Sequence, residues 1–152
     1  MRGHHSNSMK SFLFAIAFTF VILGNTIAWA ERLAVSSPLA NIRSGPGKKY
    51  DILWKVEKYH PLLILKKSGN WFNFRDFEGD EGWIHRSLLS KTPTVITNNE
   101  KCNIRQGPGT SYKILFTVGK GIPFKIIKRK GNWIQIQHAD GDEGWVHKSL
   151  VW

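Results

Sequence analysis

The chain has 152 residues and carries 22 lysine and arginine residues against 11 aspartate and glutamate residues, which gives a formal net charge of +11. Its composition is that of a folded protein, with 41% hydrophobic residues, 14 glycines and 6 prolines, and this excludes a disordered or collagen-like chain. The single cysteine, Cys102, excludes an internal disulfide framework and a cysteine-based zinc finger.

Residues 1–30 have the pattern of a secretory signal peptide. The basic start Met9-Lys10 precedes a 12-residue apolar run, Phe12–Leu23, and Ala28-Trp29-Ala30 then supplies small residues where a signal peptidase reads them. The run is too short to cross the roughly 30 Å of a bilayer comfortably, so a membrane anchor is the less favoured alternative. We expect translation from Met9, cleavage after Ala30, and an exported protein in the periplasm, outside the cell or associated with the wall.

The basic charge remains after such a cleavage. Loss of residues 1–30 removes only Arg2 and Lys10, so the rest of the chain keeps a net charge of +9. A basic exported protein meets anionic envelope material, and we therefore expect no nucleic-acid partner. Lys128-Arg129-Lys130 is a local basic cluster, with Lys66-Lys67 at the matching place. It is either a solvated hairpin tip or a salt-sensitive contact with an anionic glycan, a teichoic-type polymer or a lipid headgroup.

An internal repeat dominates the rest of the sequence. Asn41-Ile42-Arg43-Ser44-Gly45-Pro46-Gly47 recurs 62 residues later as Asn103-Ile104-Arg105-Gln106-Gly107-Pro108-Gly109, and the offset holds without a gap to the end of the chain. Between 41–89 and 103–151, 25 of 49 positions are identical. The sequence therefore predicts two tandem domains, 31–91 and 92–152. The linker between them, Ser90–Pro93, is too short to be a flexible tether.

Each copy reads as a series of short strands separated by Gly, Pro and Asn turns. No helical period is sustained over ten residues. This pattern predicts an all-β fold of two small, partly open, SH3-like β-barrels in tandem. Asp140-Gly141 has the composition of a tight hairpin turn. The expected strands are Leu33–Val35, Ala40–Arg43, Ile52–Val56, Leu62–Lys67, Trp71–Arg75 and Gly82–His85, with Val95–Thr97 opening the second copy.

A domain of about 60 residues buries only about 60% of its chain surface and needs its large apolar side chains in the core, so we assign them to the core. The residues assigned in this way are Leu53, Trp71 and Trp83 in the first copy and Leu115, Trp133 and Trp145 in the second.

The motifs Asn-Ile-Arg-x-Gly-Pro-Gly, Tyr, Gly-Asn-Trp and Gly-Asp-Glu-Gly-Trp-(Ile/Val)-His-x-Ser-Leu follow one another in both copies. In this combination the sequence resembles the bacterial SH3 domains (SH3b, type 3) over essentially all of 31–152. The resemblance implies an SH3-like barrel with an elongated loop after the Asn-Ile-Arg strand. It also implies an extracytoplasmic role, often as a targeting or accessory module of peptidoglycan hydrolases, although no catalytic domain is recognised here.

The candidate ligand-binding residues lie around the long loops. Arg43 and Arg105 could grip a ligand carboxylate through two parallel hydrogen bonds, or they could hold loop carbonyls of their own domain, which their repetition favours. Aromatic residues could form a groove for an extended peptide, with core packing as the alternative. These residues are Tyr50, Trp54 and Tyr59 in the first copy and Tyr112 and Phe116 in the second. Because Trp54 and Tyr59 are not repeated, we expect the first copy to be the stronger binder.

Nothing in the sequence assembles a metal, cofactor or catalytic site. Asp80-Glu81 and Asp142-Glu143 are neighbours that point to opposite faces, and we expect them in turns. His85 and His147 stand one per domain and are predicted to make structural hydrogen bonds. Cys102 aligns with Ala40, which predicts a small buried side chain rather than a nucleophile.

We therefore predict that the protein is not an enzyme. The favoured function is a non-catalytic cell-envelope binding module that recognises the peptide or the glycan of peptidoglycan through the long-loop grooves. The alternative is an envelope adaptor that binds an extended segment of another protein.

Overall fold

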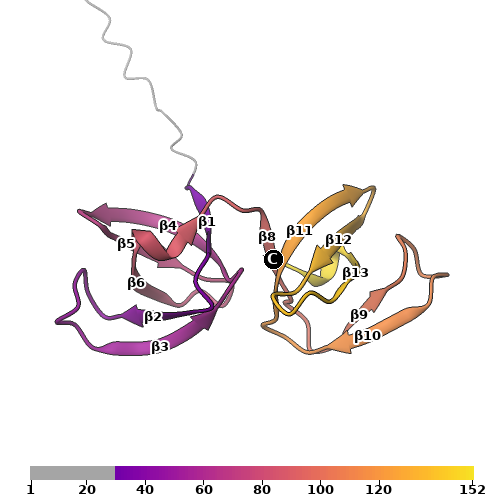
Figure 1. Cartoon of the computed structure of the whole chain (residues 1–152), viewed down its shortest axis with the longest axis horizontal. Coiled ribbons are helices and arrows are strands. Elements are labelled where there is room, and N and C mark those ends of the chain that lie inside the picture. The colour runs from indigo at the N-terminus through magenta and orange to yellow at the C-terminus, as the bar shows by residue number, and fades with distance from the viewer. Residues whose placement is uncertain (1–29) are drawn as a thin grey trace, which may run out of the picture.

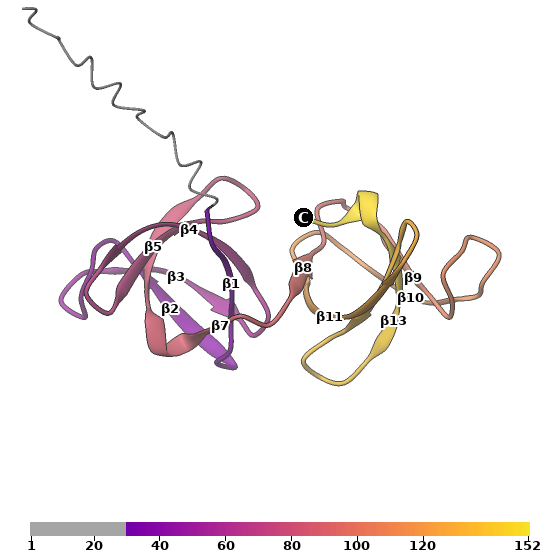
Figure 2. The ribbon, with the colours of Figure 1, turned by 90° about the horizontal axis from the view of Figure 1, so that it is seen from above.

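The computed structural model describes residues 30–152, so the expected signal peptide lies outside the described residues except for Ala30. Figures 1 and 2 show two similar β units side by side, joined by a short linker. One is a seven-stranded sheet and the other a six-stranded sheet, and every strand pairing in them is antiparallel. The expected all-β fold with two small SH3-like units is confirmed. Among the described residues, no helix is long and apolar enough to cross a membrane.

The first sheet has the strand order β3-β2-β6-β5-β4-β1-β7. Along the chain, a single turn of 3₁₀ helix, η1, lies between β6 and β7. The elements are β1 (Arg32–Val35), β2 (Leu39–Arg43), β3 (Ile52–Glu57), β4 (Pro61–Ser68), β5 (Trp71–Arg75), β6 (Glu81–His85), η1 (Arg86–Leu88) and β7 (Leu89–Ser90).

The second sheet repeats this order as β10-β9-β13-β12-β11-β8. In place of a counterpart to β7, Thr97 bridges Val151, and Ile96 and Trp152 exchange backbone hydrogen bonds of 3.1 and 2.9 Å. The elements are β8 (Thr94–Ile96), β9 (Cys102–Arg105), β10 (Ile114–Val118), β11 (Pro123–Lys130), β12 (Trp133–Gln137), β13 (Glu143–His147) and η2 (Lys148–Leu150).

The turns follow the sequence signals. Gly69 and Gly131 both have φ 56° in the hairpins that join β4 to β5 and β11 to β12, a conformation that favours glycine. The expected tight turn at Asp140-Gly141 is confirmed, because Gly141 (φ 101°) donates its backbone N–H to the carbonyl of His138. The long loops 44–51 and 106–113 connect β2 to β3 and β9 to β10.

Each unit has its own core, formed by alternate residues of its strands. Ile42, Phe74 and Ile84 are fully buried in the first, and Ile104 and Ile136 hold the same places in the second. Alternation along the strand decides which side chains enter the core, although β1 and β8 each bury three consecutive residues.

The assignment of Leu53 and Leu115 to the cores is wrong. They are 50% and 45% exposed and lie on β3 and β10, the edge strands of their sheets. No further strand of the described chain covers these edges, and most residues of both strands face solvent. Trp145 is buried as expected, whereas Trp71, Trp83 and Trp133 are only half-buried.

Residues 91–93 connect the two sheets, and Arg32 ties them together a second time. Its Nη2 donates to the backbone oxygen of Trp152 at 2.8 Å, and its guanidinium carbon lies 4.0 Å from the centre of the Trp152 ring. The first strand of one unit is therefore in contact with the last residue of the other.

Candidate ligand-binding grooves

Each barrel carries a groove beside its long loop. The groove of the first barrel has a volume of about 410 Å³ and that of the second about 180 Å³. The first is lined by Leu39, Asn41, Arg43, Lys48, Trp71, His85, Ser87 and Leu88. The second is lined by Asn103, Arg105, Thr110, Trp133, His147, Ser149 and Leu150. Every residue of the second list stands 62 positions after a residue of the first, so the chain builds the same groove twice.

Strand geometry explains why these residues meet in the first barrel. Asn41 and Arg43 are two positions apart on β2 and share one face of the sheet. Trp71 begins β5 and is paired directly with His85 at the end of β6. The 3₁₀ turn η1 then brings Ser87 into the same groove.

The guanidinium group of Arg43 is anchored in the long loop by one nitrogen. Its Nη1 donates to the carbonyl oxygens of Lys48 (3.0 Å) and Tyr50 (2.9 Å), and Arg105 repeats this pattern at Thr110 and Tyr112, both at 3.0 Å. Within residues 30–152, the Nε and Nη2 atoms of these arginines donate to no protein group. Each arginine therefore orders its loop and still keeps donors for a ligand.

The imidazole of His85 is fixed by its own chain. Its Nδ1 accepts the backbone N–H of Ser87 at 3.2 Å and lies 2.7 Å from the Ser87 hydroxyl oxygen, as His147 does with Ser149. Because Nδ1 acts as an acceptor, the neutral ring carries its proton on Nε2 and presents a further donor. The expected structural hydrogen bonding of both histidines is confirmed. Trp71 meets the ring edge-on, with centroids 5.2 Å apart.

The structure separates most of the other candidate site residues from Arg43 and Arg105. The ring of Tyr50 packs on Gly45, and that of Tyr112 packs on Gly107, so tightly that a Cβ on either glycine would overlap it. Both tyrosines reach the grooves only through the backbone carbonyls that the arginines hold.

Trp54, Phe116 and Tyr59 lie away from both grooves. Trp54 packs edge-on against Phe74 at 6.3 Å, and Phe116 packs on the core of the second barrel. Tyr59 occupies a turn with φ 72°, where Gly121 (φ 87°) stands in the second copy. One continuous aromatic groove made of the predicted residues is therefore not what the fold builds.

Sequence reasoning missed Trp71 and Trp133 as groove residues, although the alternation of β5 carried the signal. Phe72 and Phe74 point to the core, so Trp71 shares the opposite face with two polar residues, Asn73 and Arg75. A tryptophan that shares a strand face with polar residues, and that is paired with a histidine on the next strand, is the sequence pattern that indicates this surface site.

The grooves are rich in donors and contain no carboxylate. Arg43 and Lys48 bring positive charge to the first groove, and Arg105 brings it to the second. A half-buried tryptophan provides apolar surface in each, together with two leucines in the first groove and one in the second. Such a site suits a ligand that carries carbonyl, carboxylate or hydroxyl oxygens beside a flat or apolar face.

Residues 30–152 contain no group of three or more His, Cys, Asp and Glu side chains that could hold a metal ion. Cys102 is fully buried, as expected, and burial raises the pKa of its thiol. Its Sγ lies 3.4 Å from the carbonyl oxygen of Asn99. A buried thiol with a raised pKa is a poor nucleophile.

Both barrels match a single family model, described as the bacterial SH3 domain, over residues 36–91 and 98–152. The chain belongs to the bacterial SH3 domain family. The long loops that carry the arginine anchors and both grooves fall inside the two matched segments, so the grooves are features of its SH3 domains.

Two named bacterial proteins share this region. The Bacillus subtilis protein named "Putative N-acetylmuramoyl-L-alanine amidase YrvJ" is 30% identical over 137 residues, which cover 83% of this chain and 26% of that protein. The Staphylococcus epidermidis protein named "Probable cell wall amidase LytH" is 44% identical over 61 residues, which cover 40% of this chain and 21% of that protein. The chain thus spans about a quarter of the length of these relatives.

Among solved structures, an NlpC/P60 family protein from Bacillus cereus aligns with a TM-score of 0.39 and 12% identity, covering 80% of this chain and 56% of that one.

Proposed function

We propose that this protein is a non-catalytic, exported binding module of the bacterial cell envelope that recognises the peptide or the glycan of peptidoglycan through its two SH3 grooves. The relatives named as amidases, one of them as a cell wall amidase, support a cell-wall role. The shared region is a minor part of each of them, which favours a role in attachment rather than in bond cleavage.

The repeated groove is the observation that carries this proposal. In each barrel an arginine, a histidine and an asparagine offer hydrogen-bond donors next to a half-buried tryptophan. Peptide carbonyls, terminal carboxylates and sugar hydroxyls are the acceptors that such a surface fits. Two such grooves on one chain raise the overall affinity when one polymer engages both.

The test is co-sedimentation of residues 31–152 with purified peptidoglycan sacculi across a series of salt concentrations. This fragment contains both sheets and both cores in full. We expect retention that survives moderate salt. Trp71→Ala should lower retention about fivefold, because aromatic anchors dominate binding sites, and Trp133→Ala should lower it less, because the second groove is smaller.

A matched pair of leucines controls for loss of surface hydrophobicity. Leu39 is 54% exposed in the first groove, whereas Leu53 is 50% exposed outside it. Leu39→Ser should weaken retention and Leu53→Ser should leave it unchanged. Equal effects of the two substitutions, or retention lost entirely at moderate salt, would reduce the interaction to a basic surface on an anionic polymer.

Export is a separate part of the proposal. The N-terminal sequence of the protein recovered from outside the cytoplasm should begin at Glu31. A protein recovered with residues 12–23 still attached would contradict cleavage after Ala30.

A second candidate function, an adaptor for another envelope protein, is favoured by the edge strands β3 and β10. They carry exposed Ile52, Leu53, Ile114 and Leu115, and an unpaired strand edge can accept an extended segment of another chain. Absence of any retention on sacculi, even at low salt, would favour this function over wall binding.

A further inference from the structure

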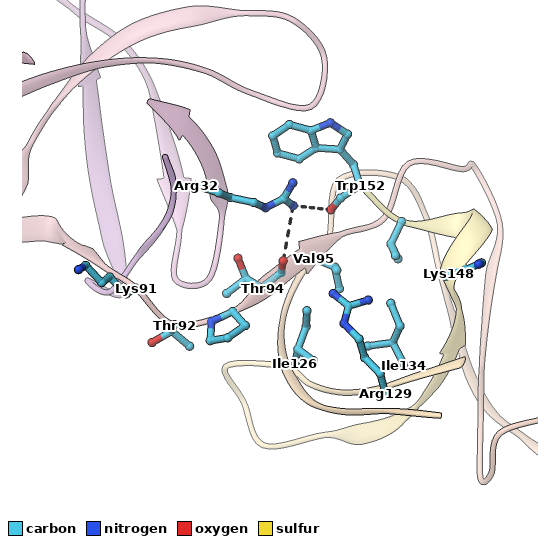
Figure 3. A pocket seen from close by; sticks show the side chains of 12 residues that line it. Arg32, Lys91, Thr92, Thr94, Val95, Ile126, Arg129, Ile134, Lys148 and Trp152 are labelled. Carbon is cyan, nitrogen blue, oxygen red and sulfur yellow. Dashed lines mark hydrogen bonds between the residues drawn. The ribbon is translucent and has the colours of Figure 1, made fainter. Parts of the chain in front are cut away.

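A pocket of about 440 Å³ lies between the two barrels, distinct from both grooves (Figure 3). None of the residues that line it lines a groove. Part of its wall is apolar, formed by Val95, Ile126, Ile134 and Val151 of the second barrel. The second barrel also contributes Thr94, Arg129, Lys148 and Trp152. The linker contributes residues 91–93, and the first barrel contributes Arg32 of β1.

Four cationic side chains line this pocket and no acidic one does. Figure 3 shows Arg32 extending from the first barrel to the backbone oxygens of Trp152 and Thr94, and Arg129 lying on the second barrel. Lys91 of the linker and Lys148 of η2 lie at its edges. Among residues 30–152 the ion pairs are Lys67–Glu31, Arg75–Glu81 and His138–Asp140, so these four cations are uncompensated.

The positive charge of Arg129 acts on Arg32. The guanidinium group of Arg32 is partly buried between the barrels, and this burial, followed by the positive charge of Arg129, lowers its pKa. Arg32 is held in place by the backbone oxygens of Trp152 (2.8 Å) and Thr94 (3.5 Å). Arg129 donates to no protein group within the described chain. An anion between them would remove the repulsion and meet free donors.

The corresponding place in the first barrel is built differently. Lys67 and Arg86 are the counterparts of Arg129 and Lys148, and Lys67 is paired with Glu31 at 2.9 Å. The uncompensated arginine is therefore a property of the interface between the barrels and does not follow from the repeat itself.

We propose that this pocket binds a phosphate group. Its cationic side chains come from four segments, β1, the linker, β11 and η2. A tetrahedral phosphate has oxygens in several directions and can meet them together, whereas a planar carboxylate is best satisfied by a single arginine fork. The Nη2 atom of Arg32 already donates to backbone oxygens, so this arginine cannot offer both of its terminal nitrogens to a carboxylate. The other cationic donors lie on other elements. Apolar walls shield part of the site from water and strengthen the attraction.

The experiment is a ¹H–¹⁵N NMR titration of residues 31–152 with three probes at fixed pH and ionic strength. Inorganic phosphate tests the free anion, glycerophosphoglycerol tests the phosphodiester found in polymers and lipid headgroups, and acetate tests a carboxylate. We expect saturable shifts at Thr94, Val95 and the Trp152 indole with at least one phosphate probe. Comparison of the first two probes then distinguishes a free phosphate from a phosphodiester.

Two substitutions localise the site. Arg129→Gln should weaken binding about tenfold, and Arg129→Lys should recover part of the loss. Lys67→Gln, which removes the same charge at the matching position of the other barrel, should leave the affinity unchanged. Arg129 is exposed, so its replacement should not unfold the protein.

Three results would each overturn the proposal: no saturable shift with either phosphate probe, acetate binding as tightly as phosphate, or equal effects of Arg129→Gln and Lys67→Gln. Sacculus binding through the grooves is measured with different variants, so either proposal can fail without the other.

Discussion

Arg43 and Arg105 each divide their donors between the loop and the groove. Because Nη1 holds two loop carbonyls, substitution of Arg43 changes loop order and ligand contact together. Loss of binding by an Arg43 variant is therefore informative only when the loop is monitored as well.

We predict that Arg43→Gln destabilises the first barrel by about 1 kcal/mol, since two hydrogen bonds from a half-buried charged donor are lost. Urea unfolding followed by NMR signals of the first barrel measures this change. Arg75→Gln is the control, because the Arg75–Glu81 pair is half-exposed and should be worth less than about 0.5 kcal/mol. Equal effects would contradict the anchoring role of Arg43.

His60 is an unusual buried residue of the first barrel. It is 9% exposed, its Nε2 has no hydrogen-bond partner among the described residues, and burial lowers its pKa to about 4. The unfolded chain takes up a proton near the ordinary pKa of 6.5, whereas the folded barrel resists protonation until about pH 4. Stability is therefore full above pH 6.5 and falls as the pH drops toward 4.

We predict that this loss reaches at most about 3 kcal/mol at pH 4 and that His60→Ile removes it. Isoleucine is the residue at the matching position of the second copy, Ile122. Since the substitution also removes an unsatisfied buried nitrogen, it should raise stability at pH 7 by about 1 kcal/mol. Unfolding free energies of both proteins between pH 7 and 4 test this, and parallel pH profiles would contradict it.

Strands β6 and β13 each carry a glycine where the backbone lies against a core isoleucine. A Cβ at Gly82 would overlap Ile42, and one at Gly144 would overlap Ile104. Gly82 stands opposite Phe74 in the β5–β6 pairing, and Gly144 stands opposite Ile136 in the β12–β13 pairing. The glycine of the repeated Glu-Gly-Trp motif is therefore required by packing in the barrel core.

We predict that Gly82→Ala destabilises the first barrel by about 2 kcal/mol, because overpacking displaces Ile42. Gly119→Ala is the control, since a Cβ there would meet only the carbonyl oxygen of Glu100 at 3.8 Å, an ordinary contact. Thermal unfolding compares the two variants. A cost for Gly82→Ala no larger than the control would show that the core has more free space than the structure indicates.

The strands themselves were predictable from sequence, usually to within one or two residues. Alternation and turn residues are local signals, and Ile52, Trp71 and His85 each mark a strand end correctly. The exposure of Leu53 and Leu115 was not predictable in this way, because it depends on which strand lies at the edge of the sheet. That order is set by pairings distant in sequence, such as β2 with β6.

On the scale of the whole molecule, the contact between Arg32 and Trp152 joins the beginning of one barrel to the end of the other. The hydrogen bond from the Arg32 side chain to the Trp152 backbone oxygen and the stacking of the guanidinium on the Trp152 ring together restrict rotation about the short linker. The arrangement also shapes the pocket that we assign to phosphate.

We predict that Arg32→Ala leaves each barrel folded but loosens their relative orientation. Residual dipolar couplings should then no longer fit a single alignment tensor for both barrels, and small-angle scattering should show a larger radius of gyration. Arg86→Ala, an exposed arginine of η1, serves as the control. Unchanged couplings in the Arg32 variant would show that the linker alone sets the orientation.

The repeat, the all-β fold, the family and the burial of Cys102 can all be predicted from the amino-acid sequence, because they follow from local alternation, turn residues and the identity of two copies. The sequence also singled out Arg43 and Arg105. The folded structure was needed to show that these arginines share a groove with Trp71 and Trp133 rather than with Trp54 and Phe116, and that Arg32 and Arg129 line one pocket. Both outcomes depend on contacts between strands far apart in the chain, which spacing along one strand does not encode.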